Sequence, residues 1–161
     1  MPDGKRWMTE NLNIETDDSW CYNNSADSCN KYGRLYDWET ANTVCPNGWK
    51  LPDTADWNRL VTTAGGKDIA GKKLKSKSGW NDFNGKSGNG TDDYGFSALP
   101  GGWRYSDGRF DAGGEDGCWW TATEYVDNRA YLLGMELHRD AVGDGWNEKS
   151  SGRSVRCVKD E

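Results

Sequence analysis

The 161-residue sequence contains ten tryptophans, and any fold it adopts must find packing partners for these rings. Its mean hydropathy is −0.99, which by itself would suggest disorder. Disordered chains are poor in aromatic residues, however, and this one also has seven tyrosines and three phenylalanines. Each large ring buries about 150–250 Å² when it packs. We therefore predict a folded, loop-rich domain whose core depends on tryptophan more than on leucine.

Length and charge limit the domain count and the classes of partner. A chain of 18.0 kDa without a visible linker or repeat predicts one domain over residues 1–161. The net charge of −6 argues against a nucleic-acid partner, which basic residues would hold through its phosphates. No run of about 18 apolar residues is present, so no membrane span is predicted. The N-terminus shows no hydrophobic signal segment, which leaves open a trimmed signal, another export route or a place inside the cell.

Five cysteines, an odd number, leave at least one thiol free: Cys21, Cys29, Cys45, Cys118 and Cys157. Their spacing includes no Cys-x-x-Cys pair, which argues against a structural zinc site. Cys21 and Cys29 flank the polar segment YNNSADS and could form a local disulfide, and Cys45 and Cys157 could close a long loop. The alternative at this point is that all five are reduced and buried.

Apolar periodicity predicts two helices in the first half of the chain. In LPDTADWNRLVTTAGG, Asp53 can cap a helix with Asp56 three residues later, and Gly65 can end it. The core-facing stripe of that helix is Trp57, Leu60, Val61 and Ala64. A shorter helix is predicted in RLYDWETANTVC. The lysine-rich segment KDIAGKKLKSK that follows is predicted to be a solvated loop.

The second half predicts short strands separated by polar loops. The candidate strands are YGFSALPGG, CWWTATEY, AYLLGMEL and SVRCVKD, covering 94–102, 118–125, 130–137 and 154–160. Residues 131–147, YLLGMELHRDAVGDGWN, fit neither a helix face nor a strand alternation over any useful length. Two helices followed by antiparallel strands predict an α+β fold.

Seven segments follow one another in the order typical of a known family: WMTENLN, CYNN, YGRLYDW, CPNGWKLPDTADWNRL, DDYGFSALPGG, WWTAT and SVRCVKD. Nearly the whole chain thereby resembles the Fibrobacter succinogenes major paralogous domain family, a branch of the C-type lectin fold. The resemblance implies two helices, a small twisted antiparallel sheet and long loops that present ligands. It also implies that the N- and C-termini meet in the sheet, which would bring Cys45 and Cys157 within bonding range.

One alternative is an enzyme, because GWKLPDTADW is also similar to a segment of formylglycine-generating enzymes, which share that fold. Such enzymes need a pair of active-site cysteines, and here Cys118 stands alone in the apolar segment GCWWT. No Gly-x-Ser-x-Gly elbow accompanies the single His138. We therefore predict no catalytic residues and no enzymatic activity.

A second alternative is a calcium-dependent lectin. The proline-containing tripeptides of sugar-binding C-type lectins are absent, although Trp146-Asn147-Glu148 resembles their Trp-Asn-Asp. Calcium needs about 6–8 oxygen ligands, some of which Asp82, Asn84, Asp92 and Asp93 could provide. No cofactor is predicted, and calcium remains an alternative whose site is unknown.

Residues 125–145, YVDNRAYLLGMELHRDAVGDG, resemble the variable region of proteins diversified by retroelements, some of which have the C-type lectin fold. Mutated adenines there yield a residue set without Lys, Gln, Glu, Met and Trp, and only Met135 and Glu136 fall outside it. The resemblance implies a diversified binding face near the C-terminus. A plain adhesion module, or an ordinary pair of loop and strand with no role in binding, are the alternatives.

The predicted binding face is held by a scaffold of Trp103, Trp119, Trp120 and Trp146 together with the possible Cys45–Cys157 bridge. The predicted contacts are Tyr125, Val126, Asp127, Asn128, Tyr131, Leu133, Leu137, His138, Arg139, Asp140, Val142, Asp144 and Trp146. Whichever of Leu132 and Leu133 faces inward is expected in the core. The predicted partner is a protein or glycan on another cell or surface, and the predicted location is extracellular, on a cell surface or a virion surface.

Overall fold

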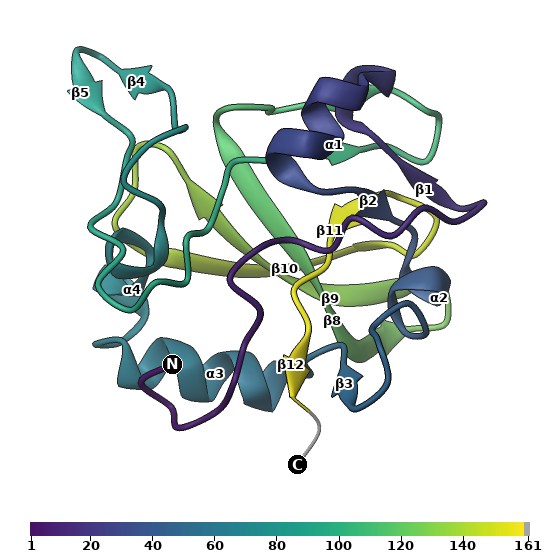
Figure 1. Ribbon diagram of the computed structural model, residues 1–161, viewed down its shortest axis with the longest axis horizontal. Helices are drawn as coiled ribbons and strands as arrows, with labels where there is room; N and C mark the ends of the chain where they lie inside the picture. Colours follow the sequence, from purple (N-terminus) through teal and green to yellow (C-terminus); the bar gives the residue numbers. More distant parts are fainter. Residues whose placement is uncertain (160–161) are drawn as a thin grey trace.

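The computed structural model describes residues 1–159 and has a mixed α/β architecture (Figure 1). Within that part of the chain there are four α-helices: α1 (Ala26–Tyr32), α2 (Trp38–Ala41), α3 (Thr54–Thr63) and α4 (Lys67–Leu74). A 3-10 turn, Tyr22–Asn24, precedes α1. The described strands do not close into a barrel; they form one larger sheet and three two-stranded ones.

The larger sheet has six strands in the order β1-β2-β11-β8-β9-β10. Their bounds are Ser19–Trp20 (β1), Leu35–Tyr36 (β2), Arg153–Ser154 (β11), Asp116–Val126 (β8), Arg129–Glu136 (β9) and Val142–Glu148 (β10). The expectation of a purely antiparallel sheet was wrong in one place, because β11 runs parallel to β8, with Ser154 opposite Trp119. The neighbouring pairs on either side are antiparallel.

The small sheets pair strands of two residues each. They are β3 (Trp49–Lys50) with β12 (Val158–Lys159), β4 (Asp82–Phe83) with β5 (Lys86–Ser87), and β6 (Trp103–Arg104) with β7 (Phe110–Asp111). The predicted strand 154–160 therefore divides into β11 and β12, and its residue 160 lies outside the described part of the chain. Segment 94–102 makes only isolated bridges, because Ser97 has a left-handed φ of 54° and Pro100 has no N–H to donate.

Helix α3 confirms its prediction. The Asp53 side chain accepts from the Asp56 N–H at 2.8 Å, and the Asp56 carboxylate accepts from the Asp53 N–H in return. The stripe is buried as predicted: Trp57, Leu60, Val61 and Ala64. The predicted helix in 34–45 is shorter than expected, since 35–36 pair in β2 and α2 begins after the capping Asp37.

The predicted loop at KDIAGKKLKSK was wrong, because its first part is helix α4. Two apolar residues four positions apart, Ala70 and Leu74, are fully buried against the core, and this tertiary contact outweighs the hydrophilic composition. Gly71 packs against the backbone of the β9–β10 loop, where an added Cβ would lie 2.5 Å from the carbonyl oxygen of Ala141. Lys75, directly after α4, is also buried.

Within 131–147, the strand predicted at 130–137 is confirmed as β9. The rest of the stretch, where no strand was predicted, contains β10, and the two strands pair in continuous antiparallel register from Val142↔Met135 to Glu148↔Arg129. The alternation is hidden in the sequence because glycines, Gly134, Gly143 and Gly145, occupy positions along one face of this pair. Because glycine has no side chain, it does not show in the sequence whether its position faces the core or the solvent.

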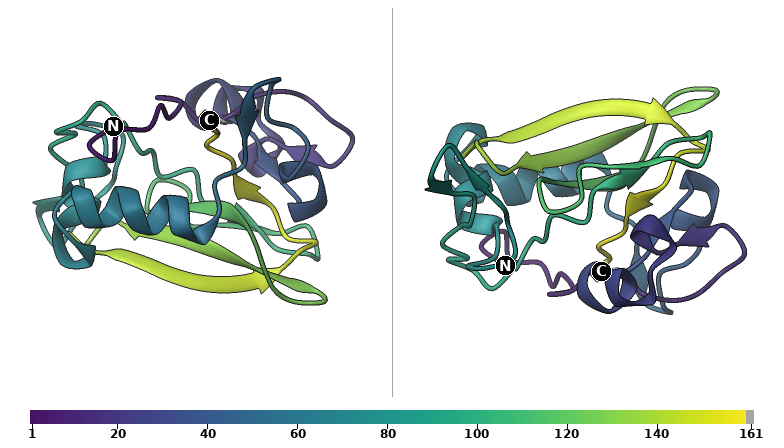
Figure 2. Two further views of the ribbon diagram at one scale, coloured as in Figure 1. Left: turned by 90° about the horizontal axis from the view of Figure 1, so that it is seen from below. Right: turned by 90° about the horizontal axis from the view of Figure 1, so that it is seen from above.

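The core consists of two clusters, one on each face of the sheet, and two adjacent tryptophans of β8 contribute one ring to each. Trp119 and Trp120 point to opposite faces of the sheet, and both are completely buried. Trp119 joins a cluster under α3 and α4 and lies 6.3 Å from Trp57, centroid to centroid, whereas Trp120 joins a cluster with Tyr36 on the other face. Figure 2 shows α3 and α4 lying along one face of β8, β9 and β10.

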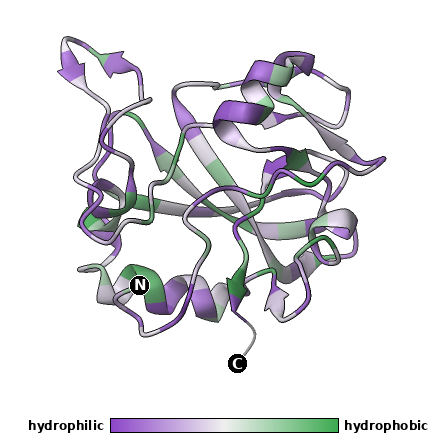
Figure 3. Ribbon diagram, in the orientation of Figure 1, coloured by the Kyte–Doolittle hydropathy of each residue, from purple (hydrophilic) through white to green (hydrophobic). Residues whose placement is uncertain are grey.

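Tryptophans nearer the surface are covered by cations. Arg104 lies over Trp20 with 4.1 Å from the guanidinium carbon to the ring centroid, and the Lys149 ammonium lies 4.4 Å from the Trp38 centroid. Hydrophobic residues are accordingly interspersed along the ribbon without long continuous runs (Figure 3). These contacts explain how a chain of such low mean hydropathy can hold ten tryptophans.

The two terminal segments run side by side, as the resemblance implied, but they meet outside the six-stranded sheet. Trp7 forms an isolated bridge with Val158 of β12, and β12 itself pairs with β3. The Met8 N–H donates to the Cys157 carbonyl at 3.0 Å, and the Lys159 N–H donates to the Arg6 carbonyl at 2.8 Å. Cys45 and Cys157 form a disulfide with 6.0 Å between their Cα atoms. The predicted pairing is thereby confirmed, and Cys118 is free.

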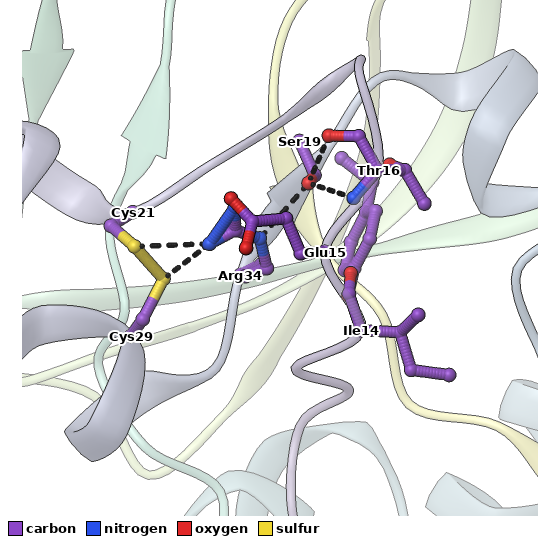
Figure 4. Close-up of polar contacts among 8 residues, drawn as sticks. Ile14, Glu15, Thr16, Ser19, Cys21, Cys29 and Arg34 are labelled. Carbon is purple, nitrogen blue, oxygen red and sulfur yellow. Dashed lines mark hydrogen bonds and ion pairs between the residues drawn. A yellow bond between two sulfur atoms is a disulfide. The ribbon is translucent and has the colours of Figure 1, made fainter. Parts of the chain in front are cut away.

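The second disulfide joins Cys21 to Cys29 as predicted, and a guanidinium lies against it (Figure 4). Arg34 Nη1 lies 3.2 and 3.3 Å from the two sulfur atoms, its Nε donates to Ser19 Oγ, and its Nη2 pairs with Glu15 at 2.7 Å. Arg34 therefore ties the segment before β1 to the start of β2. Two disulfides are typical of proteins that fold outside the cytoplasm.

Candidate functional site

The predicted contacts divide between the two ends of the β9–β10 pair. On one face, Met135, Leu133 and Tyr131 lie opposite Val142, Asp144 and Trp146 in that order. The helices α3 and α4 cover the first pair, whereas in the last pair Tyr131 is half-buried and Trp146 is exposed. At about 3.4 Å per residue, a seven-residue strand separates its two ends by roughly 20 Å. The thirteen residues therefore do not form one site.

The exposed end carries an aromatic cluster of Tyr125, Tyr131 and Trp146. Tyr125 and Trp146 are stacked, with 5.2 Å between ring centroids and an interplanar angle of 1°, and Tyr131 meets Tyr125 edge-on at 5.2 Å. Tyr125 is 41% exposed and Trp146 45%. Trp146 was also expected to help hold the scaffold, but its exposure at the edge strand shows that the fold does not bury it.

A guanidinium borders this cluster. The Arg129 guanidinium carbon lies 4.4 Å from the Trp146 ring centroid. Arg129 lay inside the compositionally unusual segment but was not among the predicted contacts. The turn after β8, with the exposed Asp127 and Asn128, and the 47% exposed Val126 complete this end of the sheet.

A groove of about 260 Å³ lies beside the cluster, between the start of α3 and the β9–β10 face. Its polar groups come from Thr54 and Asn58 on α3 and from Asp144 on β10, and Tyr131 lines its wall. Asp144 is ion-paired with Lys67 at the first position of α4. No sequence pattern indicated the α3 residues, because they lie beside β10 only in the folded chain.

Three predicted contacts are core residues, which corrects their assignment. Leu133, Leu137 and Val142 are buried in the cluster beneath α3 and α4. Leu133 lies opposite Trp119 of β8 and Val142 opposite Met135, so both point toward the helices. Leu133 is thus the inward member of the Leu132–Leu133 pair. Their side chains pack into the core, where Leu133 also borders the groove beside Tyr131 and Leu137 also borders the cavity at the β4–β5 hairpin.

The remaining predicted contacts lie at the other end, in the loop between β9 and β10. His138, Arg139 and Asp140 are exposed there. His138 Nε2 lies 3.3 Å from a carboxylate oxygen of Glu136, and its ring lies 5.2 Å from that of Phe83. This end belongs to a separate cavity, bordered by the β4–β5 hairpin.

A larger cavity, of about 580 Å³, lies elsewhere, between residues 9–13, the end of α1 and residues 92–99. Several of its side chains are occupied by internal hydrogen bonds. Asn11 Oδ1 accepts from Trp119 Nε1 at 2.9 Å and from Arg156, and the Asp92 carboxylate accepts from the Ser97 N–H and hydroxyl at 2.7 Å each. These contacts hold the structure together, so the size of this cavity does not by itself identify a site.

The potential reactive groups are few. Burial raises the pKa of the Cys118 thiol to about 12, so the thiolate that acts as a nucleophile is disfavoured. Within residues 1–159, no three His, Cys, Asp or Glu side chains group in a way that could hold a metal ion. Asp82 and Asn84 lie on the β4–β5 hairpin, and the Asp92 carboxylate is engaged by Ser97. No helix in the described part is long and apolar enough to cross a membrane.

Comparison with known proteins identifies the chain at the level of family. No curated protein and no solved structure matches it. A family model, described as the Fibrobacter succinogenes major domain, matches residues 3–159. That match spans every helix and strand described above, including both disulfides. The chain therefore belongs to the Fibrobacter succinogenes major domain family.

Proposed function

We propose that the protein is a non-catalytic binding module that presents the aromatic cluster of Tyr125, Tyr131 and Trp146 to a protein on another surface. The observation that carries this proposal is the exposed, stacked Tyr125–Trp146 pair with Arg129 beside it. Trp, Tyr and Arg are the residue types in which protein-binding energy concentrates. Exposed apolar patches on monomers commonly mark interaction sites.

The scaffold suits this role because few groups must be ordered on binding. The cluster stands on β8, β9 and β10, whose other end is locked under α3 and α4. Rigid strands limit the conformational entropy lost when a partner binds. The side-by-side termini, the bridge between Cys45 and Cys157 and the helix over one sheet face are features we take to support a C-type-lectin-like fold.

Diversification by a retroelement is part of the proposal. Its residue pattern covers 125–145, and the members with exposed side chains lie at the two ends of the β9–β10 pair, with Asp144 between them. The buried Leu133, Leu137 and Val142 would then be fixed positions between variable ones. A template repeat nearly identical to this segment, beside a reverse transcriptase in the encoding DNA, is the expected finding.

A glycan ligand is the second candidate, and the groove beside Tyr131 favours it. Thr54, Asn58 and Asp144 offer hydroxyl, amide and carboxylate groups to sugar hydroxyls next to an aromatic ring. Among residues 1–159 no three acidic side chains are grouped to hold calcium, so there it would need backbone or amide oxygens as well.

The proposal is tested with two matched variants, Trp146→Ser and Ile14→Ser. Both replace an exposed hydrophobic side chain, 45% and 44% accessible, but only Trp146 belongs to the aromatic cluster. Surface proteins captured by the unchanged protein are identified, and each is then purified and titrated against all three forms by biolayer interferometry. We expect Trp146→Ser to abolish binding and Ile14→Ser to preserve it. Equal binding by all three forms would refute the proposed face.

A further inference from the structure

A second cavity, of about 430 Å³, lies at the opposite end of the β9–β10 pair from the aromatic cluster. It is bounded by α4, by the loop that joins β9 to β10, and by the β4–β5 hairpin, which projects beyond α4 in Figure 1. The side chains that matter for its chemistry are Lys72, Lys75, Phe83, Lys86, His138 and Asp140. Its volume lies within the range of about 300–1,000 Å³ typical of small-molecule sites.

The cavity is positively charged although the chain is acidic. Three lysines line it against a single carboxylate, Asp140, in a protein whose net charge is −6. Asp140 lies 3.8 Å from the ammonium of Lys72 and so neutralises at most one of the three. Lys86, on β5, is exposed at the rim. Charges of one sign in a concave, partly desolvated site attract ligands of the other sign.

Lys75 adds a buried positive charge whose hydrogen-bond acceptors are backbone carbonyls and not a carboxylate. Its side chain is 2% exposed, and its ammonium donates to the backbone carbonyls of Glu136 at 3.0 Å and Arg139 at 2.9 Å. Among residues 1–159 no carboxylate lies within ion-pair distance of it. Burial lowers the pKa of Lys75 accordingly. An anion in the adjoining cavity would compensate this charge.

An aromatic wall accompanies the charges. Phe83 is 47% exposed, and its ring lies against that of His138 with 5.2 Å between centroids. Phe83 also pairs directly with Lys86 across the hairpin, so both side chains leave the same face of it. Ser87 and Asn89 supply hydroxyl and amide groups next to them. An exposed aromatic ring beside polar groups suits the apolar face of a sugar.

We propose that this cavity binds an anionic monosaccharide unit, its carboxylate or sulfate held by Lys72 and Lys86 and its ring against Phe83. The unit could be free or the end of a surface glycan, because either offers the same chemistry. This site lies about 20 Å from the aromatic cluster along β10 and does not depend on the function proposed for that cluster.

The experiment measures binding by isothermal titration calorimetry with four probes: glucuronate, N-acetylglucosamine 6-sulfate, glucose and inorganic phosphate. The variants are Lys72→Gln with Lys86→Gln, and Phe83→Ala. Lys77→Gln is the matched control, since Lys77 is an exposed lysine outside this cavity. Melting temperatures establish that each variant is folded.

We expect glucuronate or the sulfated sugar to bind and glucose to bind at least about tenfold more weakly, because it lacks a charge-assisted contact. The double lysine variant and Phe83→Ala should each weaken binding about tenfold, and Lys77→Gln should not. Binding should weaken when ionic strength rises from about 0.01 M to about 0.15 M.

Four outcomes would overturn the proposal. These are no binding by either anionic sugar, equal binding by glucose, equal loss in Lys77→Gln, and equally tight binding by inorganic phosphate. The last would show that the ring of the sugar contributes nothing. The affinity for a glycan that carries the tighter-binding sugar at its end, compared with the affinity for the free sugar, then distinguishes a glycan ligand from a free monosaccharide.

Discussion

Arg156 is completely buried, yet among residues 1–159 its guanidinium donates only to neutral acceptors. Nε and Nη2 donate to Asn11 Oδ1 at 3.1 and 2.8 Å, and Nη1 donates to the Met8 carbonyl at 3.1 Å. Burial lowers the pKa of Arg156 to about 9. The charge survives because several hydrogen bonds replace its hydration. No sequence pattern predicted this contact, since Asn11 and Arg156 lie 145 positions apart.

Asp116 shows the opposite case, a carboxylate that the fold disfavours. Burial raises its pKa to about 6 from 3.8, with further contributions from Glu136, opposite it on β9, and from Glu115. The folded protein therefore binds more protons than the unfolded chain between about pH 4 and pH 6, so stability falls as pH rises through this window. Above it the penalty is constant.

Asp116→Asn should remove that penalty. We expect a gain of about 1 kcal/mol in unfolding free energy at pH 7.5, after discounting for partial exposure, and almost none at pH 3.5. Urea denaturation at the two pH values measures it. Asp127→Asn, in the exposed turn after β8, is the control. An equal gain at both pH values would exclude titration of Asp116 as the cause.

Helices and strands were predictable where one face of the element has a continuous pattern of apolar residues. Helix α3 has both a capping pair at Asp53 and Asp56 and a continuous apolar stripe, so its position followed from local pattern. Helix α4 buries only Ala70, Gly71 and Leu74, and this short apolar pattern was not recognised among its lysines. Strand β10 alternates glycine with side chains of every polarity, so its register is apparent only from its pairing with β9.

The same limit explains the binding face. Composition marked residues 125–145 as unusual, but it could not separate Leu133, which packs beneath α3, from Tyr131, which is only half-buried. Whether a side chain on this strand face is buried depends on how far the helices extend over it, and this is a property of the tertiary structure. Predicted contacts at the two ends of the strand pair consequently include both exposed and core residues.

A paired substitution separates these two classes of residue. Leu133→Ala should lower the unfolding free energy by about 2–5 kcal/mol, because it leaves a cavity beneath α3. His138→Ser and Arg139→Ser, at exposed positions, should each change it by less than about 0.5 kcal/mol. Urea denaturation measures all three. A loss below about 1 kcal/mol for Leu133→Ala would place this side chain outside the core.

In the whole molecule, the surroundings of the tryptophans differ between the interior and the surface. Tryptophans such as Trp57, Trp119 and Trp120 fill the interior, and those near the surface lie under arginine or lysine side chains. Cations over the rings keep the surface polar while the stems of the long side chains cover apolar area. Mean hydropathy therefore underestimates how much core this chain can build.

The two disulfides should contribute unequally to the stability of the whole chain. Cys45–Cys157 spans 112 positions and ties the segment before β3 to the C-terminal segment, whereas Cys21–Cys29 spans 8. In the chain-entropy model the longer loop contributes about 5 kcal/mol and the shorter about 2.5 kcal/mol, because closing a longer loop removes more unfolded conformations. Double alanine variants of each pair, compared by urea denaturation, test the difference. Mass spectrometry of the non-reduced protein should show both bridges with Cys118 free. Equal losses in the two variants would mean that strain or residual structure outweighs loop closure, since that term differs between the loops by about 2 kcal/mol.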